Sequence, residues 1–188
     1  MSAWKFACAF VIWGMLSPSD MRADERPNIL FCIADDWGWP HAGVYGDRVV
    51  KTDAFDRLAR EGVLFENAFV TAPSCTASRN SLLTGQWHWR LGEGANLWST
   101  LHPKHAVYPL LLKQAGYHIG HWRKAWGPGD WRALGRTEDP AGSTYNGFAE
   151  FLKARPKHQP FCFWLGASDP HRPYEWQSGP KSGIDITR

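Results

Sequence analysis

The sequence predicts an α/β fold: a mostly parallel sheet with helices on both faces. Two observations lead to this class. Continuous apolar runs, typical of strands buried on both faces, occur at 28–34 (NILFCIA) and 161–167 (FCFWLGA). Segments with a helical spacing of apolar residues lie between these runs. Alternating strands and helices are most economically arranged as a parallel sheet with helices packed on each face.

The first half of the chain supplies one further predicted strand and two helices. Residues 52–62 read as a helix that Thr52 can cap and Gly62 can end. Residues 63–70 (VLFENAFV) are expected to form a short strand. A second helix is expected to start at Cys75 and to end at Gly85.

The second half continues the alternation. Residues 107–116 predict a helix, because Pro109 is tolerated in a first turn and Gly116 can end the helix. Residues 117–122 predict a weaker strand, and 146–155 predict a helix before the apolar run at 161–167. The order of elements therefore remains α/β to residue 167.

Length and composition fit one globular domain. The chain has 188 residues, of which 44% are hydrophobic and 21% charged, and we find no repeat or low-complexity tract. The formal charge of +3 is small and not clustered. A nucleic-acid partner is therefore not expected, since it would need a basic face or stripe.

The first residues are typical of an export signal. Lys5 precedes an apolar stretch at 6–16, and a small residue, Ala23, ends the following polar segment. The stretch is too short for a permanent membrane span. We expect 1–23 to be a signal peptide and 24–188 to be the folded part, secreted or periplasmic. An uncleaved amphipathic start is the alternative.

Three cysteines remain after this signal, which contains Cys8. Cys32 and Cys162 lie in apolar runs and are expected to be buried thiols that could pair if their strands are neighbours. Cys75 instead lies in a polar segment, PSCTASR, at the start of a predicted helix. Its surroundings favour chemistry over packing.

Polar segments follow each predicted strand. They are DDWG at 35–38, SCTASR at 74–79, RKAWGPGD at 123–130 and SDPHRP at 168–173. The carboxyl ends of parallel strands share one edge of a sheet, where ligands bind. The sequence therefore predicts one site built from all four segments.

Residues in these segments suggest anion and metal chemistry. Asp35 and Asp36 are adjacent carboxylates, which a cation such as Ca²⁺ or Mg²⁺ would neutralise. Arg79 lies one helical turn after Cys75, at a helix start that favours anions. Lys124 could add a positive charge, and His171 could exchange protons near neutral pH. Each residue alone also has a structural interpretation: a loop cap, a salt bridge, a solvated charge or a turn.

The motifs resemble those of the sulfatase family. CTASR is similar to the signature in which a cysteine, followed four positions later by arginine, is oxidised to formylglycine. RPNILFCIADDWG, LLKQAGYHIG and SDPHRPY occur in the family's expected order. KAWGPGDW and SDPHRPY are most similar to heparan N-sulfatase-like (sulfamidase-like) members, with the alkaline-phosphatase-like fold.

The resemblance implies a role for each residue. Asp35, Asp36 and modified Cys75 would hold Ca²⁺, or else Mg²⁺, and Arg79 would hold the hydrated aldehyde. One oxygen of the hydrate would attack sulfur, and the other would then expel sulfate. Lys124 would bind a sulfate oxygen, and His171 would protonate or orient the leaving group. The implied partners are a sulfated carbohydrate and the formylglycine-generating enzyme.

Two departures from the family pattern stand out. Trp126 occupies the position where many sulfatases have a histidine, a role that His118 or His121 could take over. The family's second metal pair and second lysine come from sequence beyond Arg188, so we expect an N-terminal part of the catalytic domain with little turnover by itself.

Two other functions are compatible with these residues. The first is a phosphate or phosphonate monoester hydrolase of the same superfamily, which would use the same modified cysteine. The second is a non-catalytic relative. The 12 tryptophans suit either core packing or stacking against sugar rings, and Trp37, Trp87 and Trp131 are expected to shape the substrate pocket.

Overall fold

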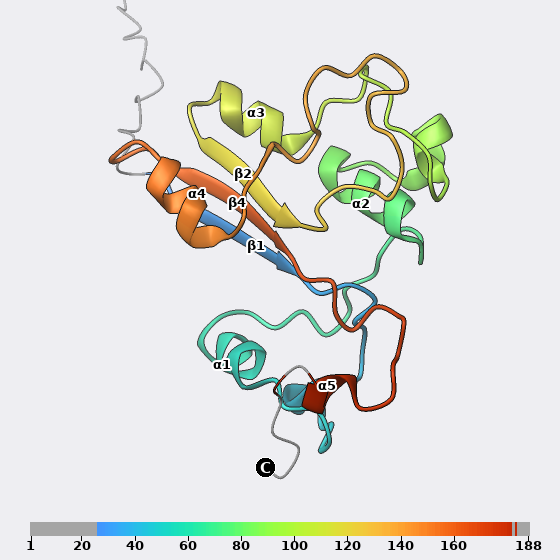
Figure 1. The fold of residues 1–188 in the computed structure, drawn as a ribbon, viewed down its shortest axis with the longest axis vertical. Helices are drawn as coiled ribbons and strands as arrows, with labels where there is room; N and C mark the ends of the chain where they lie inside the picture. The colour runs from blue at the N-terminus through green and yellow to red at the C-terminus, as the bar shows by residue number, and fades with distance from the viewer. Residues whose placement is uncertain (1–25, 182, 184–188) are drawn as a thin grey trace, which may run out of the picture.

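A parallel four-stranded sheet forms the centre of the molecule (Figure 1). The computed structural model describes residues 26–181 and 183, so the expected signal peptide at 1–23 lies outside the described residues. The strand order is β1-β4-β2-β3, and every pairing is parallel. The strands are β1 (Ile29–Ile33), β2 (His118–Arg123), β3 (Ser143–Thr144) and β4 (Phe161–Gly166). The predicted fold class is confirmed.

Three of the four predicted strands are present as β1, β2 and β4. The prediction for 63–70 is wrong: this segment is irregular, and Val63, Phe65 and Phe69 are exposed. Strand propensity takes effect only when a neighbouring strand packs against the segment, and no described strand pairs with it. The two-residue β3 is too short to produce a sequence pattern.

The four predicted helices are also present, with ends shifted by one or two residues. They are α1 (Asp53–Glu61), α2 (Cys75–Thr84), α3 (Tyr108–Gln114) and α4 (Phe148–Ala154). Gly85 adopts the left-handed conformation that ends α2, with φ of 65°. Pro109 lies in the first turn of α3, where its missing N–H has no helical partner to lose. The short helix α5 (Ser178–Lys181) and three 3-10 turns, η2 (Gly43–Tyr45), η3 (His88–Arg90) and η4 (Gly92–Ala95), complete the structure.

Helices cover both faces of the sheet. On one face, Trp164 of β4 belongs to a buried cluster with Leu83 of α2 and Val107 at the start of α3. On the other face, Phe163 of β4 packs against Phe151 of α4. Successive strand residues point to opposite faces, so Phe163 and Trp164 anchor one layer each. Burial of each large side chain contributes about 1.5–3 kcal/mol.

Of the two cysteines in the apolar runs, one is buried as expected and the other is not. Cys162 is buried, and burial raises its pKa to about 11. Cys32 is exposed, which contradicts its expected burial. In the β1–β4 register, Cys162 pairs with Ile29 and Cys32 with Leu165, so the two thiols point to opposite faces. Both are free, although their strands are neighbours.

Helix α1 lies beyond the carboxyl ends of the strands, away from the sheet (Figure 1). Its Phe55 contacts the rings of Trp37 and Tyr45, while Leu58 remains 64% exposed. Within 26–181, no helix is both long and apolar enough to cross a membrane.

Candidate active site

The carboxyl ends of β1 and β4 bring the first and last polar segments together. Ala167 donates its backbone N–H to the carbonyl of Ile33 at 2.9 Å, which extends the parallel ladder by one step. The backbone N–H of Asp35 then donates to the carbonyl of Asp169 at 3.1 Å. These bonds fix the segment that carries Asp35 and Asp36 beside the segment that carries His171.

Helix α2 is held against the segment that follows β2. Thr76 donates its hydroxyl to the carbonyl of Pro128 at 2.5 Å. Trp126 donates its indole N–H to Oδ1 of Asn80 at 2.7 Å, and Asn80 donates to the carbonyl of Gly94 at 2.9 Å. Thr76 and Asn80 are fully buried. The helix therefore presents Cys75, its first residue, in a fixed place, although no strand precedes it.

Arg79 ties Asp35 to the end of β2. Its Nη2 donates to Oδ1 of Asp35 at 3.0 Å, and its Nη1 donates to the carbonyl of Lys124 at 2.6 Å. Both side chains of this ion pair are 5% exposed. A buried pair of this kind is specific in geometry, and the loss of one partner leaves an uncompensated charge.

Lys124 connects the carboxylate to the cysteine. Its ammonium group contacts Oδ2 of Asp35 and lies 3.3 Å from the sulfur of Cys75. Its backbone N–H donates to the carbonyl of Gly166 at 3.2 Å. A side chain at Gly166 would collide with the carbonyl of Lys124, so a glycine is needed at this end of β4.

The charges around Asp35 stabilise its ionised form. Burial by itself would raise the pKa of Asp35, but hydrogen bonds and positive charges from Lys124 and Arg79 outweigh it. The net effect lowers the pKa of Asp35 below its ordinary value. Asp35 is therefore a carboxylate at neutral pH and a suitable cation ligand.

A candidate metal cluster combines three of the predicted residues. One ligand atom each from Asp35, Cys75 and His171 lies within 4.8 Å of the other two. Asp36 is not in this cluster; its Oδ2 lies 3.7 Å from Nε2 of His171, and its side chain is about half exposed. Carboxylate oxygens suit Ca²⁺ or Mg²⁺, and an oxygen in place of the cysteine sulfur would improve the fit. The donor set is thus compatible with a divalent cation.

The tautomer of His171 follows from its other contact. Its Nδ1 lies 2.7 Å from the carbonyl oxygen of Arg172. A carbonyl only accepts, so Nδ1 carries the proton and Nε2, which lies near Asp36, has a lone pair in the neutral imidazole. Protonation of Nε2 would make it a proton donor in the same position.

A cavity of about 460 Å³ lies at the carboxyl end of β1. Its lining includes Asp35, Asp36, Cys75, Arg79 and Trp37. A second cavity of about 440 Å³, which Trp87 lines, shares Val70, Ser78 and Leu82 with the first. The two hollows are therefore neighbours, and Trp87 lies beyond the one that contains Cys75.

The structure thus brings Asp35, Cys75, Arg79, Lys124 and His171 together, with Asp36 at the margin. His118 and His121 have contacts elsewhere: His118 lies 3.3 Å from the hydroxyl of Tyr145, and His121 lies 3.1 Å from the hydroxyl of Thr144. Sequence reasoning missed the supporting Gly166 and Asn80. A glycine at the end of an apolar strand was the available signal for Gly166.

Comparison with known proteins identifies the family. The sequence model of the sulfatase family matches residues 27–182, which is most of the chain. The chain belongs to the sulfatase family. It is 32% identical over 170 residues to the ulvan-active sulfatase of Formosa agariphila, with 84% of this chain and 33% of that protein covered.

Two further sulfatases support the assignment. The N-acetylglucosamine-6-O-sulfatase of Bacteroides thetaiotaomicron is 30% identical over 184 residues, covering 84% of this chain and 32% of that protein. The human N-acetylgalactosamine-6-sulfatase is 38% identical over 119 residues, covering 53% of this chain and 23% of that protein. This sulfatase chain spans about a third of the length of the first two relatives. The finer likeness to heparan N-sulfatases stays a prediction.

Solved structures agree with the fold. The structure of BT4656 in complex with its substrate D-glucosamine-2-N,6-O-disulfate superposes with a TM-score of 0.61 and 26% identity, covering 80% of this chain and 36% of that one. The structure of Ps i-CgsB in complex with k-i-k-neocarrahexaose gives a TM-score of 0.62 at 19% identity, covering 86% of this chain and 49% of that one. The parallel sheet and its helices therefore belong to a sulfatase fold.

Proposed function

We propose that this protein hydrolyses the sulfate ester, or the N-sulfate, of a sulfated carbohydrate through a formylglycine made from Cys75. One observation carries the proposal: Lys124 connects the sulfur of Cys75 to the buried carboxylate of Asp35 at the carboxyl edge of a parallel sheet. Membership of the sulfatase family supports the same reaction. Ulvan, N-acetylglucosamine and disulfated glucosamine in the names of its relatives support a sulfated sugar as substrate.

The geometry supports a defined role for each of the two positively charged side chains, Lys124 and Arg79. Lys124 would bind an oxygen of the sulfate, because its ammonium group already lies between the nucleophile position and a carboxylate. Arg79 lines the cavity but is buried, and it donates to Asp35 and to the carbonyl of Lys124. Arg79 therefore positions the other two residues, and it would also hold the oxidised side chain at position 75.

A divalent cation, Ca²⁺ or Mg²⁺, would be held by Asp35, by Asp36 and by the oxidised residue at position 75. Bound there, the cation would draw negative charge from the sulfate oxygens, while the hydrated aldehyde would supply the nucleophilic oxygen. Asp36 would need to turn toward the cluster from its half-exposed position. Asp35 needs no such change, because it is already buried and ionised.

His171 is the proposed proton donor to the leaving group. Its Nδ1 is engaged by the carbonyl of Arg172, so only Nε2 is available to the substrate. A leaving group that is a poor base, such as an aryl oxide, needs less protonation than a sugar hydroxyl. His171→Ala should therefore lower the turnover of a sugar sulfate more than the turnover of an activated aryl sulfate.

The deciding experiment is oxidation followed by hydrolysis. The full chain is co-expressed with a formylglycine-generating enzyme, and the peptide that contains Cys75 is examined by mass spectrometry. Aldehyde at position 75 would support the proposal if sulfate is also released from a sulfated sugar, slowly as expected of this chain by itself, and is not released by the Cys75→Ala variant. A persistent thiol would favour a non-catalytic relative, and faster hydrolysis of the matched phosphate ester would favour a phosphomonoesterase.

Export is the proposed localisation. The apolar stretch at 6–16 after Lys5 supports a signal peptide, and a sulfated polysaccharide would be met outside the cytoplasm. Determination of the N-terminal residue of the mature protein tests this: a start near Asp24 is expected, and an intact Met1 in the exported fraction would contradict it.

A further inference from the structure

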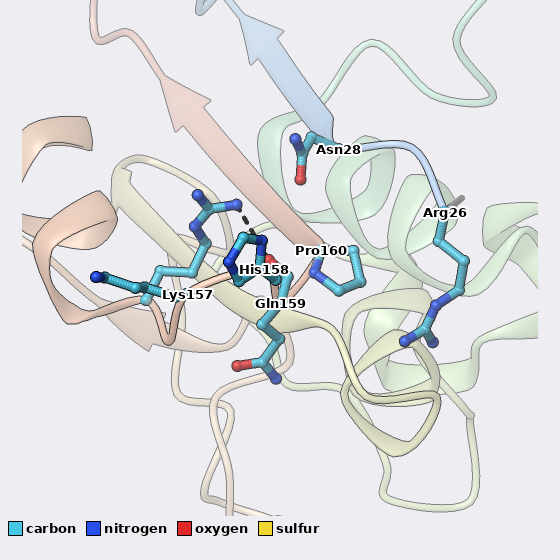
Figure 2. Close-up of a pocket in the computed structure, with 7 residues that line it drawn as sticks. Arg26, Asn28, Lys157, His158, Gln159 and Pro160 are labelled. Atoms are coloured by element: carbon cyan, nitrogen blue, oxygen red, sulfur yellow. Dashed lines mark hydrogen bonds between the residues drawn. The ribbon is translucent and has the colours of Figure 1, made fainter. Parts of the chain in front are cut away.

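A basic pocket lies at the end of the sheet opposite to the candidate active site (Figure 2). Its volume is about 520 Å³, and it is formed where β1 and β4 begin. Asn28 directly precedes β1, and Pro160 directly precedes β4. The five residues of β1 separate this pocket from Asp35 by roughly 17 Å, at about 3.3 Å per strand residue.

Positive charge dominates the pocket. Arg26, Arg155 and Lys157 line it, together with Asn28, His158 and Gln159. No acidic side chain is among these lining residues. The amide side chains of Asn28 and Gln159 add uncharged hydrogen-bonding groups. An electropositive hollow without carboxylates favours an anionic ligand.

Two arginines hold unused donors in fixed places. The Nε atoms of Arg26 and Arg155 are buried and have no hydrogen-bond partner. Other contacts hold each guanidinium in place. Arg26 donates to the carbonyl of Ala115 and lies over the ring of Tyr117. Arg155 donates to the carbonyl of Gln159 at 3.1 Å and lies over the ring of Phe161. A buried donor without an acceptor is unfavourable. An oxyanion in the pocket would meet the outer Nη groups of the same two arginines, which form charge-assisted hydrogen bonds with such acceptors.

We propose that this basic pocket binds a sulfo group of a sulfated glycan, separately from the group that is hydrolysed. The choice of a glycan depends on the proposed function, whereas the affinity for a tetrahedral oxyanion depends only on the pocket. Free sulfate has the same chemistry and is the product of the reaction. The separation from Cys75 means that a sulfo group here belongs to another sugar unit, so the pocket would favour long sulfated chains over single sugars.

Binding is tested by NMR titration of the full chain carrying Cys75→Ala. The probes are inorganic sulfate, a sulfated tetrasaccharide and the same tetrasaccharide without sulfate. We expect the sulfated tetrasaccharide to shift amide resonances of 26–28 and 155–161, and to bind there more tightly than inorganic sulfate. Equal or weaker binding of the tetrasaccharide would overturn the assignment to a glycan. Shifts confined to the surroundings of Asp35 would overturn the site itself.

Variants that remove positive charge from the basic pocket test its binding independently of the NMR titration. Lys157 is exposed, so Lys157→Gln removes a charge without loss of packing. Lys157→Gln combined with Arg155→Gln should weaken the binding of the sulfated tetrasaccharide at least tenfold, since each lost contact is a charge-assisted hydrogen bond. Lys51→Gln, a matched exposed lysine near α1, should leave the binding unchanged. Equal effects of the two single lysine variants would contradict a defined pocket.

The two proposals can fail separately. Failure of Cys75 to be oxidised would overturn the proposed hydrolysis but would leave the pocket titration unaffected. Conversely, unchanged tetrasaccharide affinity in the Arg155 and Lys157 variants would overturn the pocket, while oxidation of Cys75 and release of sulfate from a monosaccharide would be untouched.

Discussion

The ammonium group of Lys124 lies 3.3 Å from the sulfur of Cys75. The same group contacts Oδ2 of Asp35, so a positive charge bridges the residue to be oxidised and the carboxylate expected to bind a metal ion. A divalent cation that uses Asp35 must share this carboxylate with Lys124. The two positive charges are compatible if the ammonium group turns toward the sulfate when the cation binds.

This competition predicts opposite effects of one substitution. Lys124→Met should tighten Ca²⁺ binding about tenfold or more, because a unit charge about 4 Å away opposes the cation even at a high effective dielectric constant. The same variant should lose measurable affinity for sulfate in the active-site cavity. Calorimetric titration with each ion measures both effects. Weaker Ca²⁺ binding in Lys124→Met would show that Asp35 is not a metal ligand.

The buried pair of Asp35 and Arg79 predicts a stability effect. Arg79→Gln removes one of the two charged partners of the buried Asp35, with Lys124 remaining, and should lower the free energy of unfolding by about 3 kcal/mol. Asp35→Asn should lower the free energy of unfolding by a similar amount. The double variant should lose less than the sum of the two, since the two substitutions remove both sides of one ion pair. Urea denaturation of the four proteins measures this, and additive losses would mean that the two residues are not coupled.

Gly166 predicts a positioning effect without any change of charge. Gly166→Ala places a methyl group against the carbonyl of Lys124 and should separate the ends of β2 and β4. We expect lower sulfate affinity at the active site, because Lys124 is displaced. Gly46→Ala is a control for the loss of a glycine, since nothing lies within 4 Å of its added methyl group, although its φ of 92° also brings strain. Unchanged sulfate affinity in Gly166→Ala would refute this role of the glycine.

These relationships also show how far the sequence could lead. Apolar runs identified β1 and β4 because both are continuous and end in charged residues, and strand order then placed Asp35 and His171 at one edge. The placement of Cys75 was correct for another reason than expected: α2 is held by Thr76 and Asn80, and no strand precedes it. Such contacts join residues about 50 positions apart, and local pattern does not contain them.

Errors of the sequence reasoning have the same origin. The segment 63–70 has the composition of a strand, but strand formation depends on a partner that local sequence does not reveal. Cys32 has apolar neighbours, yet its face of β1 is uncovered in the described part of the chain, so it is exposed. The absence of Asp36 from the cluster of Asp35, Cys75 and His171, and its left-handed φ of 60°, were equally invisible in the motif.

The pH dependence of stability should reflect His105. Burial lowers the pKa of this histidine, and the positive charges of Lys104, His102 and Arg136 act in the same direction. The unfolded chain, with an ordinary pKa of about 6.5, therefore takes up the proton first as the pH falls. The contribution of the neutral His105 to the free energy of unfolding is complete above about pH 6.5 and declines below it. Melting temperatures between pH 8 and 5 measure the decline, which should be shallower in His105→Gln.

Trp87 predicts a preference for longer substrates. It stacks on Trp89 with ring centroids 4.8 Å apart and remains 53% exposed, so a flat apolar face is available beside the cavity that contains Cys75. A sugar ring next to the sulfated one could stack on this face. Trp87→Ala should raise KM for a sulfated disaccharide several-fold and leave KM for a sulfated monosaccharide unchanged. Trp98→Ala, which removes another exposed tryptophan that does not line either cavity, is the matched control. An equal rise for both substrates in Trp87→Ala would place its effect on the fold of the site instead of on a neighbouring sugar.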